Sequence, residues 1–382
     1  MGAEILLYGY GLVCLSMLVF NVLYALHLRA GDRRLDRRMA DIRRQVSTEL
    51  NLIQADSNQP VQVSHLTWMR RRLSRVNYLL AFDHLLNELD RSDAAFQSYM
   101  RQMQPVFLHL STVYWRRDDT QAAYYCHFLA RHRLPQNSEL DQIQRVLLSY
   151  LSKGSLYCRL NALKALCSFG SPQALSDALE ELGRDQSNQL HEKMITEALL
   201  TYTGSADELI ELLWRRLGRF TLQIQRAVLD YIRFKSGNYK RQMELILRDE
   251  GRDRELRFAA IRYFGKYPDE SVRGLLLDFV RDRNELRWEY AAISATSLAR
   301  YPGRDVVDAL MEAMHSPNWY VRYNASASLE AHGLSYEEMM DVLSGNDRYA
   351  REMLNYRLES KRLAKLSLSR SSGARGEVTA GV

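Results

Sequence analysis

The residue types that most often do chemistry are scattered along this 382-residue chain. None of its nine histidines belongs to an HExxH motif or another metal-ligand spacing. The nearest pair, His127 and His132, is five residues apart, which does not place both on one face of a helix. The sequence also lacks a phosphate-binding glycine loop and a GxSxG motif. We therefore expect no metal, no cofactor and no enzymatic activity.

The four cysteines form no reactive or metal-binding pattern. They are Cys14, Cys126, Cys158 and Cys167, and no two of them are spaced as CxxC. This indicates neither a disulfide framework nor a zinc site, and a reducing compartment fits most of the chain.

Aromatic residues next to arginines are the one feature that points to a binding site. They occur as WMRRRLSR (68–75), YWRR (114–117) and LWRRL (213–217), and again in LRWEY and NWYVRY. Trp and Arg are enriched at the centres of protein interfaces, and they can also stack on bases or sugars. The simplest alternative is a tryptophan half-buried in the core beside an arginine that faces water. The candidate partner-binding residues are Trp115, Arg116, Arg117, Trp214, Arg215, Arg216, Trp288 and Trp319.

The second half of the chain repeats one phrase: an arginine near the start of a helix, an alanine, a turn and a second apolar helix. The arginines are Arg159, Arg226, Arg257, Arg287 and Arg322, and the last four are separated by 31, 30 and 35 residues. A period in this range indicates stacked helical hairpins, because one hairpin cannot bury its apolar face alone. We expect six units, the second of which has Glu192 or Lys193 in place of the arginine. The five arginines are expected to be structural and to pair with an acidic side chain or a carbonyl of the adjacent repeat.

Every unit has a turn at the same phase. The turns are SFGSPQA, TYTGSAD, FKSGNY, KYPDES, RYPGRD and AHGLSY. Gly or Pro ends the first helix of each pair, and Ser or Asp can cap the second. Six turns in phase predict an all-α solenoid with almost no sheet.

The pattern Arg-x-x-Ala, then Gly or Tyr-Pro, then Ala-Leu or Leu-Leu resembles HEAT repeats over residues 154–343, about half of the chain. The resemblance implies an extended concave surface that binds another protein. The whole layout also resembles bacterial membrane-anchored HEAT-repeat proteins that accompany glycosyltransferases of envelope polysaccharide synthesis. This second resemblance implies a scaffold whose partner is a membrane enzyme. Two alternatives are a nucleic-acid-binding protein similar to the HEAT-like alkyl-base glycosylases, and a HEAT-type lyase that acts on a bilin.

Residues 5–28 contain no charged side chain. As a helix they would be about 36 Å long, enough to cross the ~30 Å hydrocarbon core of a bilayer. Arginines follow this segment and none precede it, which is the opposite of a cleavable signal peptide. We expect a single-pass membrane anchor, with a buried core helix or a signal peptide as the alternatives.

The formal net charge of +6 is concentrated at two places. Residues 29–44 hold seven arginines and three aspartates, and residues 359–382 hold five basic and two acidic side chains. The remaining body, residues 45–358, is neutral overall, which argues against nucleic acid as a partner. The positive-inside rule places the body in the cytoplasm, below the plasma (inner) membrane, with the N-terminus outside. Residues expected to contact anionic lipid are Arg33, Arg34, Arg37, Arg38, Arg43 and Arg44.

A juxtamembrane stalk helix is expected over residues 29–59. Its apolar residues Leu35, Met39, Ile42, Val46 and Ile53 follow the spacing of a coiled-coil seam, which Glu49 interrupts. A solvated stalk and a stalk that forms a homodimer both fit this pattern.

The chain is thus divided into five expected segments. These are a transmembrane anchor (1–28), the stalk (29–59), a helical N-terminal cap or degenerate repeats with four or five helices (60–152), the repeat solenoid (153–358) and a basic tail expected to be disordered (359–382). One helix of the cap is expected over residues 99–115, and Pro105 should begin or kink it.

Overall fold

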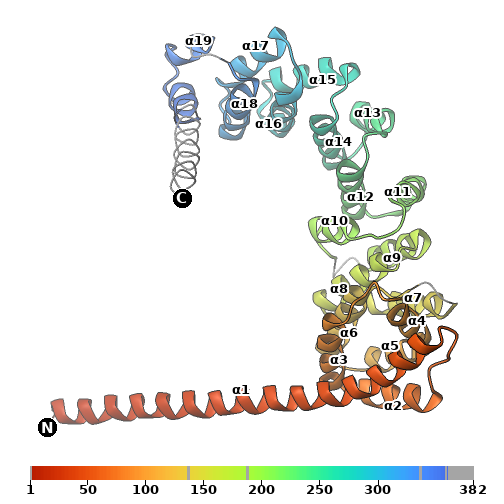
Figure 1. Ribbon diagram of the computed structural model, residues 1–382. Helices are drawn as coiled ribbons and strands as arrows, with labels where there is room; N and C mark the ends of the chain where they lie inside the picture. Colours follow the sequence, from red (N-terminus) through yellow and green to blue (C-terminus); the bar gives the residue numbers. More distant parts are fainter. Residues whose placement is uncertain (1, 136–137, 186–188, 335–337, 358, 360–382) are drawn as a thin grey trace, which may run out of the picture. The chain divides into compact units, whose positions relative to one another are not determined.

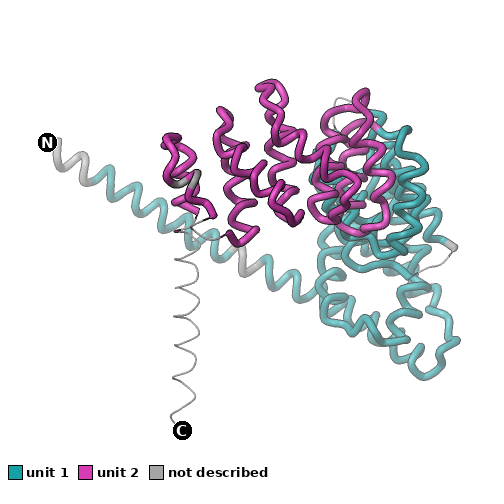
Figure 2. Tube along the Cα trace, turned by 90° about the horizontal axis from the view of Figure 1, so that it is seen from above, with its two compact units in different colours: residues 1–220 teal, residues 221–382 magenta. Residues whose placement is uncertain are grey.

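The computed structural model describes residues 2–135, 138–185, 189–334, 338–357 and 359. Throughout this part of the chain all regular structure is helical, and no strand occurs. The expected all-α fold is therefore confirmed. The chain divides into two compact units, residues 1–220 and residues 221–382 (Figure 2).

Unit 1 begins with one long helix, α1 (Gly2–Ala55), which joins the expected anchor and stalk without a break (Figure 1). An 18-residue window in this helix is apolar enough to cross a membrane, with a mean hydropathy of 2.0, and none of that window is buried. Towards the other end, Ile42, Val46 and Ile53 are buried where α1 packs against α3 (Val76–Glu88) and α4 (Ala94–Gln102). Since these three residues pack within their own chain, this part of the predicted seam is not free to join a second copy.

The residue that interrupts the seam, Glu49, is also buried. Its carboxylate accepts a hydrogen bond from the Gln62 amide (3.2 Å) and lies 4.0 Å from Nδ1 of His65. On the neighbouring turn, Arg43 pairs with Glu88 of α3. Because polar contacts of this kind need a defined geometry, they set the rotation of α1 on the rest of the unit.

Six helices, not four or five, lie between α1 and the repeats in the described residues. They are α2 (Val63–Leu73), α3, α4, α5 (Gln104–Trp115), α6 (Asp119–His132) and α7 (Ser138–Tyr150). The prediction was wrong because the arginine-rich segment 63–73 is helical, and because the one helix expected over residues 99–115 is divided at Met103. Pro105 lies in the first turn of α5, where its missing N–H costs no helical hydrogen bond.

Six helical hairpins follow, as expected, within the described residues. Unit 1 contains α8 (Leu156–Ser168) with α9 (Pro172–Arg184), and α10 (Glu192–Leu200) with α11 (Ala206–Arg215). Unit 2 contains α12 (Leu222–Lys235) with α13 (Lys240–Arg248), α14 (Arg254–Lys266) with α15 (Glu270–Arg281), α16 (Trp288–Ser297) with α17 (Arg304–Ala313), and α18 (Trp319–His332) with the single turn α19 (Met340–Leu343). Residues 348–357 form one more helix. The side chains of Ser171, Ser205 and Asp269 cap the second helices α9, α11 and α15.

The hairpins of unit 2 are arranged in two layers (Figure 1). The first helices α12, α14, α16 and α18 pack against one another in series, and α13, α15 and α17 cover one side of this row. Apolar side chains such as Leu256, Ile261 and Phe264 of α14 are buried between the layers. Burying one side chain of this size contributes about 1.5–3 kcal/mol, so each hairpin depends on its neighbours for stability.

Tyrosines at the turns connect successive repeats. In unit 1, the Tyr202 hydroxyl donates a hydrogen bond to the Gly170 carbonyl of the preceding turn (2.9 Å). In unit 2, the Tyr301 hydroxyl donates to the Phe264 carbonyl (3.3 Å) and accepts from the Asp269 amide (3.1 Å). These bonds explain why a tyrosine recurs at the same position of the repeat. Its hydroxyl forms hydrogen bonds with backbone groups of the preceding turn that would otherwise have no partner.

Candidate protein-binding surface

The first two turns of α18 present aromatic side chains to solvent. Asn318 caps the helix by accepting a hydrogen bond from the Tyr320 amide (2.9 Å), so that α18 begins at Trp319. Trp319, Tyr320 and Tyr323 remain 55%, 56% and 38% exposed, whereas Val321 is buried and attaches this end of the helix to the unit. Exposed apolar side chains that are grouped, and not scattered singly, mark interaction sites.

These rings form two stacked pairs. Trp319 and Tyr323 stack within α18, with ring centroids 4.9 Å apart and planes inclined by 21°, as helix positions i and i+4 allow. Trp288 of α16 stacks on Tyr320 at 5.4 Å and 22°, and this pair connects two repeats. We call Trp288, Trp319, Tyr320 and Tyr323 the aromatic surface. Since stacking already orders the rings, a partner loses little side-chain entropy by binding to them.

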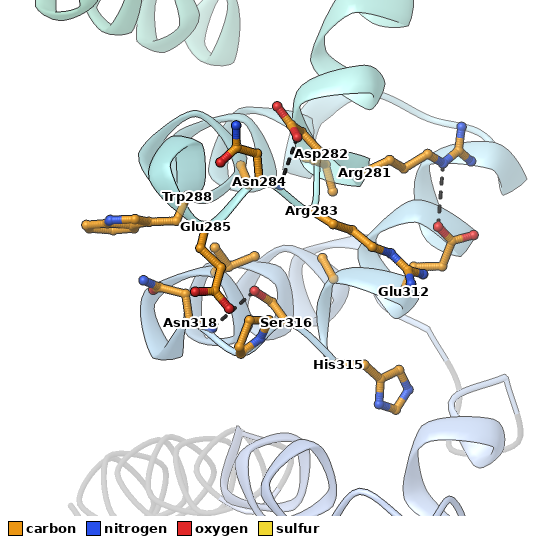
Figure 3. A pocket seen from close by; sticks show the side chains of 15 residues that line it. Arg281, Asp282, Arg283, Asn284, Glu285, Trp288, Glu312, His315, Ser316 and Asn318 are labelled. Atoms are coloured by element: carbon orange, nitrogen blue, oxygen red, sulfur yellow. Dashed lines mark hydrogen bonds and ion pairs between the residues drawn. The ribbon is translucent and has the colours of Figure 1, made fainter.

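A polar pocket of about 560 Å³ borders the aromatic surface, between the loop after α15 and the turn before α18 (Figure 3). Its labelled lining residues include Trp288, Glu285, Arg283, Ser316 and Asn318. Arg281 and Glu312 form an ion pair in its wall (3.7 Å). The pocket offers hydrogen-bonding groups beside the stacked rings.

A second depression, the C-terminal groove, has a volume of about 550 Å³ and lies between α18 and the helix of residues 348–357. It is lined by Pro317, Trp319, Arg322, Tyr323, Tyr349, Glu352, Met353, Tyr356 and Arg357. Asp347 connects its two sides, because it accepts from Nη1 of Arg322 (3.0 Å) and lies 3.2 Å from Nδ1 of His315. Desolvation acts to raise the pKa of Asp347, but hydrogen bonds from the Ala350 amide, Arg322 and His315 outweigh it and hold that pKa at about 2.

Two of the predicted binding residues, Trp288 and Trp319, are brought together through Tyr320 in unit 2.

Trp115, Arg116 and Arg117 lie at the end of α5 in unit 1. Trp115 is 45% exposed, and the Arg117 carbonyl accepts a hydrogen bond from Nζ of Lys153 (3.2 Å). This group presents a single exposed ring, and so it offers a partner a smaller contact than the aromatic surface.

Trp214, Arg215 and Arg216 lie at the end of α11, also in unit 1. Nη1 of Arg216 contacts Asp177 (2.8 Å) and Glu180 (3.3 Å) of α9, and Arg215 pairs with Glu211 of its own helix. Arg216 therefore connects two hairpins, a role that the sequence pattern did not reveal.

The repeat arginines form contacts between neighbouring helices and loops. Arg159 and Arg257 are buried. Arg257 donates from Nε to the Leu247 carbonyl (3.0 Å) and from Nη1 to the Tyr290 hydroxyl (3.3 Å). The other three form ion pairs: Arg226 with Glu255 (3.1 Å), Arg287 with Asp282 (3.3 Å) and Arg322 with Asp347 (3.0 Å).

The predicted membrane-surface arginines lie on α1 between its apolar segment and its buried end. Arg33, Arg34, Arg37 and Arg44 are exposed. Arg43 pairs with Glu88, and the guanidinium of Arg38 lies 5.8 Å from the centre of the Tyr78 ring. Two of the six arginines therefore contact the body of unit 1.

Tyr349, Tyr356 and Arg357 of the C-terminal groove were not among the predicted binding residues, because residues 344–358 were assigned to the end of the solenoid without a binding role. Tyr349 and Tyr356 are 71% and 68% exposed, and Arg357 lies over the ring of Tyr323. The signal was present in the spacing of Tyr349, Met353 and Tyr356, at positions i, i+4 and i+7, which places them on one helix face.

Within the described residues, no group of three or more His, Cys, Asp or Glu side chains is arranged to hold a metal ion. His132 instead contacts Asp83 through Nε2 (2.5 Å), and Tyr124 donates to the same carboxylate (2.9 Å). Burial lowers the pKa of His132, partly offset by Asp83. This cluster connects α6 with α3, whereas His127 is exposed.

One match to a protein family supports the repeat architecture. Residues 243–330 match the family model of HEAT repeats. Comparison with curated protein sequences gives no match. A designed armadillo repeat protein is 18% identical, with a TM-score of 0.25, over 59% of this chain and 99% of its own. An engineered protein is 14% identical, with a TM-score of 0.29, over 82% of this chain and 98% of its own. With the HEAT-repeat match, the hairpins described above make this chain a helical-repeat solenoid.

Proposed function

We propose that this chain is a membrane-tethered adaptor, without enzymatic activity, that binds a protein partner through the aromatic surface of unit 2. One observation carries the proposal: two stacked aromatic pairs lie across the adjacent repeats of α16 and α18, and three of their four rings, Trp319, Tyr320 and Tyr323, are exposed. Trp, Tyr and Arg are the residues that contribute most to binding at protein interfaces. Helical-repeat solenoids are also well suited to presenting such extended surfaces.

The tether is α1. Its apolar, unburied window has the length and hydropathy of a membrane span, and the exposed arginines that follow favour a cytoplasmic body and contact with anionic lipid. Between Leu28 and the first buried residue, Ile42, the helix advances about 21 Å. A continuous helix of this length would hold unit 1 at a fixed distance from the lipid.

For the partner we propose a membrane enzyme. Two proteins confined to one membrane meet at a high effective concentration, so a moderate affinity suffices for a lasting complex. The resemblance of the layout to membrane-anchored HEAT-repeat proteins supports a glycosyltransferase of envelope polysaccharide synthesis.

The proposal is tested by affinity capture of the full-length protein, crosslinked in native membranes before solubilisation and analysed by mass spectrometry. One variant carries Trp319→Ala and Tyr323→Ala. The matched control is Tyr157→Ala, which removes a 72% exposed aromatic ring from α8 in unit 1. The wild type and the control should capture the same dominant membrane protein, and the double variant should lose it. Equal capture by all three proteins would refute the aromatic surface as the binding site.

A further inference from the structure

The C-terminal groove shares Trp319 and Tyr323 with the aromatic surface, but it adds a cation, Arg357, that forms no ion pair within the described residues. We propose that this groove binds an acidic peptide segment of the partner, which places apolar side chains between the two walls and a carboxylate on Arg357. This inference rests on the proposed function, because it names the kind of segment through which the partner is held.

The walls of the groove present apolar side chains from two helices. Trp319 and Tyr323 lie on the α18 side, and Tyr349, Met353 and Tyr356 lie on the other side. The latter three occupy one face of the helix 348–357. A neighbouring face holds this helix on the unit, since Ala350 and Leu354, each one position after Tyr349 and Met353, are completely buried. The groove-lining side chains are therefore not needed to attach the helix and are available to a ligand.

Arg357 supplies the charge. Its guanidinium lies 4.2 Å from the centre of the Tyr323 ring, and its Nε is buried without a hydrogen-bond partner. In the described part of the chain it forms no ion pair, whereas the groove's other charged side chains, Arg322 and Glu352, pair with Asp347 and Arg348. A guanidinium held against a ring, with free N–H groups, is well placed to bind a carboxylate.

The positive charge of Arg357 also distinguishes between the possible ligands of the groove. The chain's own C-terminal segment, residues 359–382, carries five basic and two acidic side chains, so it matches an arginine-containing groove poorly. A second copy related by two-fold symmetry would present the same groove, with its own Arg357, to the first. A nucleic-acid strand needs several cations along its phosphates, but this groove offers one unpaired cation and the carboxylate of Glu352. An acidic peptide with apolar anchors satisfies both the walls and Arg357.

The test uses the full-length protein in detergent micelles and a library of random twelve-residue peptides displayed on phage. Peptides selected on the wild type should contain Asp or Glu together with Leu, Phe or Trp. Their affinity should fall about tenfold or more for Arg357→Glu and for Tyr356→Ala, the loss expected for one charge-assisted hydrogen bond or one interface anchor. Arg357→Lys should retain part of the affinity.

The matched control is Arg304→Glu, the same charge reversal on α17 outside the groove, at a side chain that is 67% exposed. It should leave peptide affinity unchanged. Circular dichroism of each variant excludes a folding defect, and Arg357→Gln provides a milder replacement if the charge reversal unfolds the helix.

Five outcomes would overturn the inference. Four of them are no enriched peptide, enriched peptides without acidic residues, equal binding to Arg357→Glu, and single-stranded oligonucleotide binding that this variant abolishes. A further one is a tenfold gain in peptide affinity on removal of residues 360–382, which would show that the tail occupies the groove. If peptide selection fails while Trp319→Ala with Tyr323→Ala still loses the membrane partner, the proposed function stands without this inference. If that double variant retains the partner, the proposed function itself is wrong.

Discussion

The rings of Trp319 and Tyr323 stack on each other on the outside of α18, 4.9 Å apart, while both remain substantially exposed. Neither ring fills the interior of unit 2. Exposed apolar rings grouped in this way mark interaction sites, and this grouping is the basis of the proposed binding surface.

The first prediction follows directly. Replacing Trp319 and Tyr323 with alanine should lower the free energy of unfolding by no more than about 2 kcal/mol, because only their stacking and the contact of Tyr323 with Arg357 are lost. Phe264→Ala should cost about 3–5 kcal/mol, since this ring is fully buried in α14. Urea unfolding followed by circular dichroism makes the comparison. A large loss of stability in the exposed pair would mean that these rings are structural.

The second prediction concerns the close approach of successive turns. A Cβ atom added to Gly204 would lie 2.6 Å from the Gly170 carbonyl oxygen of the preceding turn. Gly204→Ala should therefore destabilise the protein by about 1–3 kcal/mol through a forced backbone shift. The control is Gly274→Ala in α15, where a Cβ meets nothing within 4 Å. That change should be neutral or should stabilise by up to about 1 kcal/mol, since alanine is the better helix former. Thermal unfolding of both variants makes the comparison. A lower melting temperature for Gly274→Ala than for Gly204→Ala would contradict the close approach of these turns.

The third prediction tests the tyrosines that connect repeats. Tyr301→Phe removes a hydroxyl that donates to the Phe264 carbonyl and accepts from the Asp269 amide. The expected loss of stability is about 1–3 kcal/mol, because buried polar groups lose a partner. Tyr320→Phe, at a ring that is 56% exposed, should have no measurable effect. Equal stabilities of the two variants in urea would show that the tyrosine bond is dispensable.

The fourth prediction separates the two parts of α1. A chain that starts at residue 29 should leave the membrane fraction and keep its thermal stability, because the buried residues of α1 begin at Ile42. A chain that starts at residue 56 should be strongly destabilised, since it loses the apolar contacts of Ile42, Val46 and Ile53 with α3 and α4. Carbonate extraction and thermal unfolding test the two halves of this statement. Membrane retention of the chain that starts at residue 29 would contradict the tether.

The fifth prediction concerns pH. The pKa of Asp347 is lowered to about 2 in the folded protein, from a usual value near 4. Since the folded-state pKa is depressed, the stabilisation by this carboxylate is fully present above about pH 4 and is lost as the pH falls towards 2. The difference in melting temperature between the wild type and Asp347→Asn should therefore be present at pH 4 and should be largely lost near pH 2. A difference that persists unchanged at pH 2 would exclude an ionised Asp347 as its source.

The repeats could be predicted from the sequence because their signals are local. Glycine and proline in the turns, and serine or aspartate at the caps, specify each hairpin whatever its neighbours do, as Ser171 and Asp269 show. The division of one expected helix at Met103 was missed, because Pro105 is equally compatible with a kink and with a new first turn.

Whether the stalk packs on its own chain or on a second copy could not be predicted, because the same apolar spacing is found in both kinds of helix. The burial of Ile42 and Val46 against α3 and α4 depends on residues distant in sequence. The candidate site shows the same limit. Trp288 and Trp319 could be named as candidates from their composition, but their connection through Tyr320 and the ion pairs of Arg216 appear only in three dimensions.

The measurement that tests the central claim most directly is crosslinked capture from native membranes with Trp319→Ala and Tyr323→Ala beside Tyr157→Ala. The account predicts one dominant membrane protein captured by the wild type and by Tyr157→Ala, and lost from the double variant. Undiminished capture of the same protein by the double variant would contradict it.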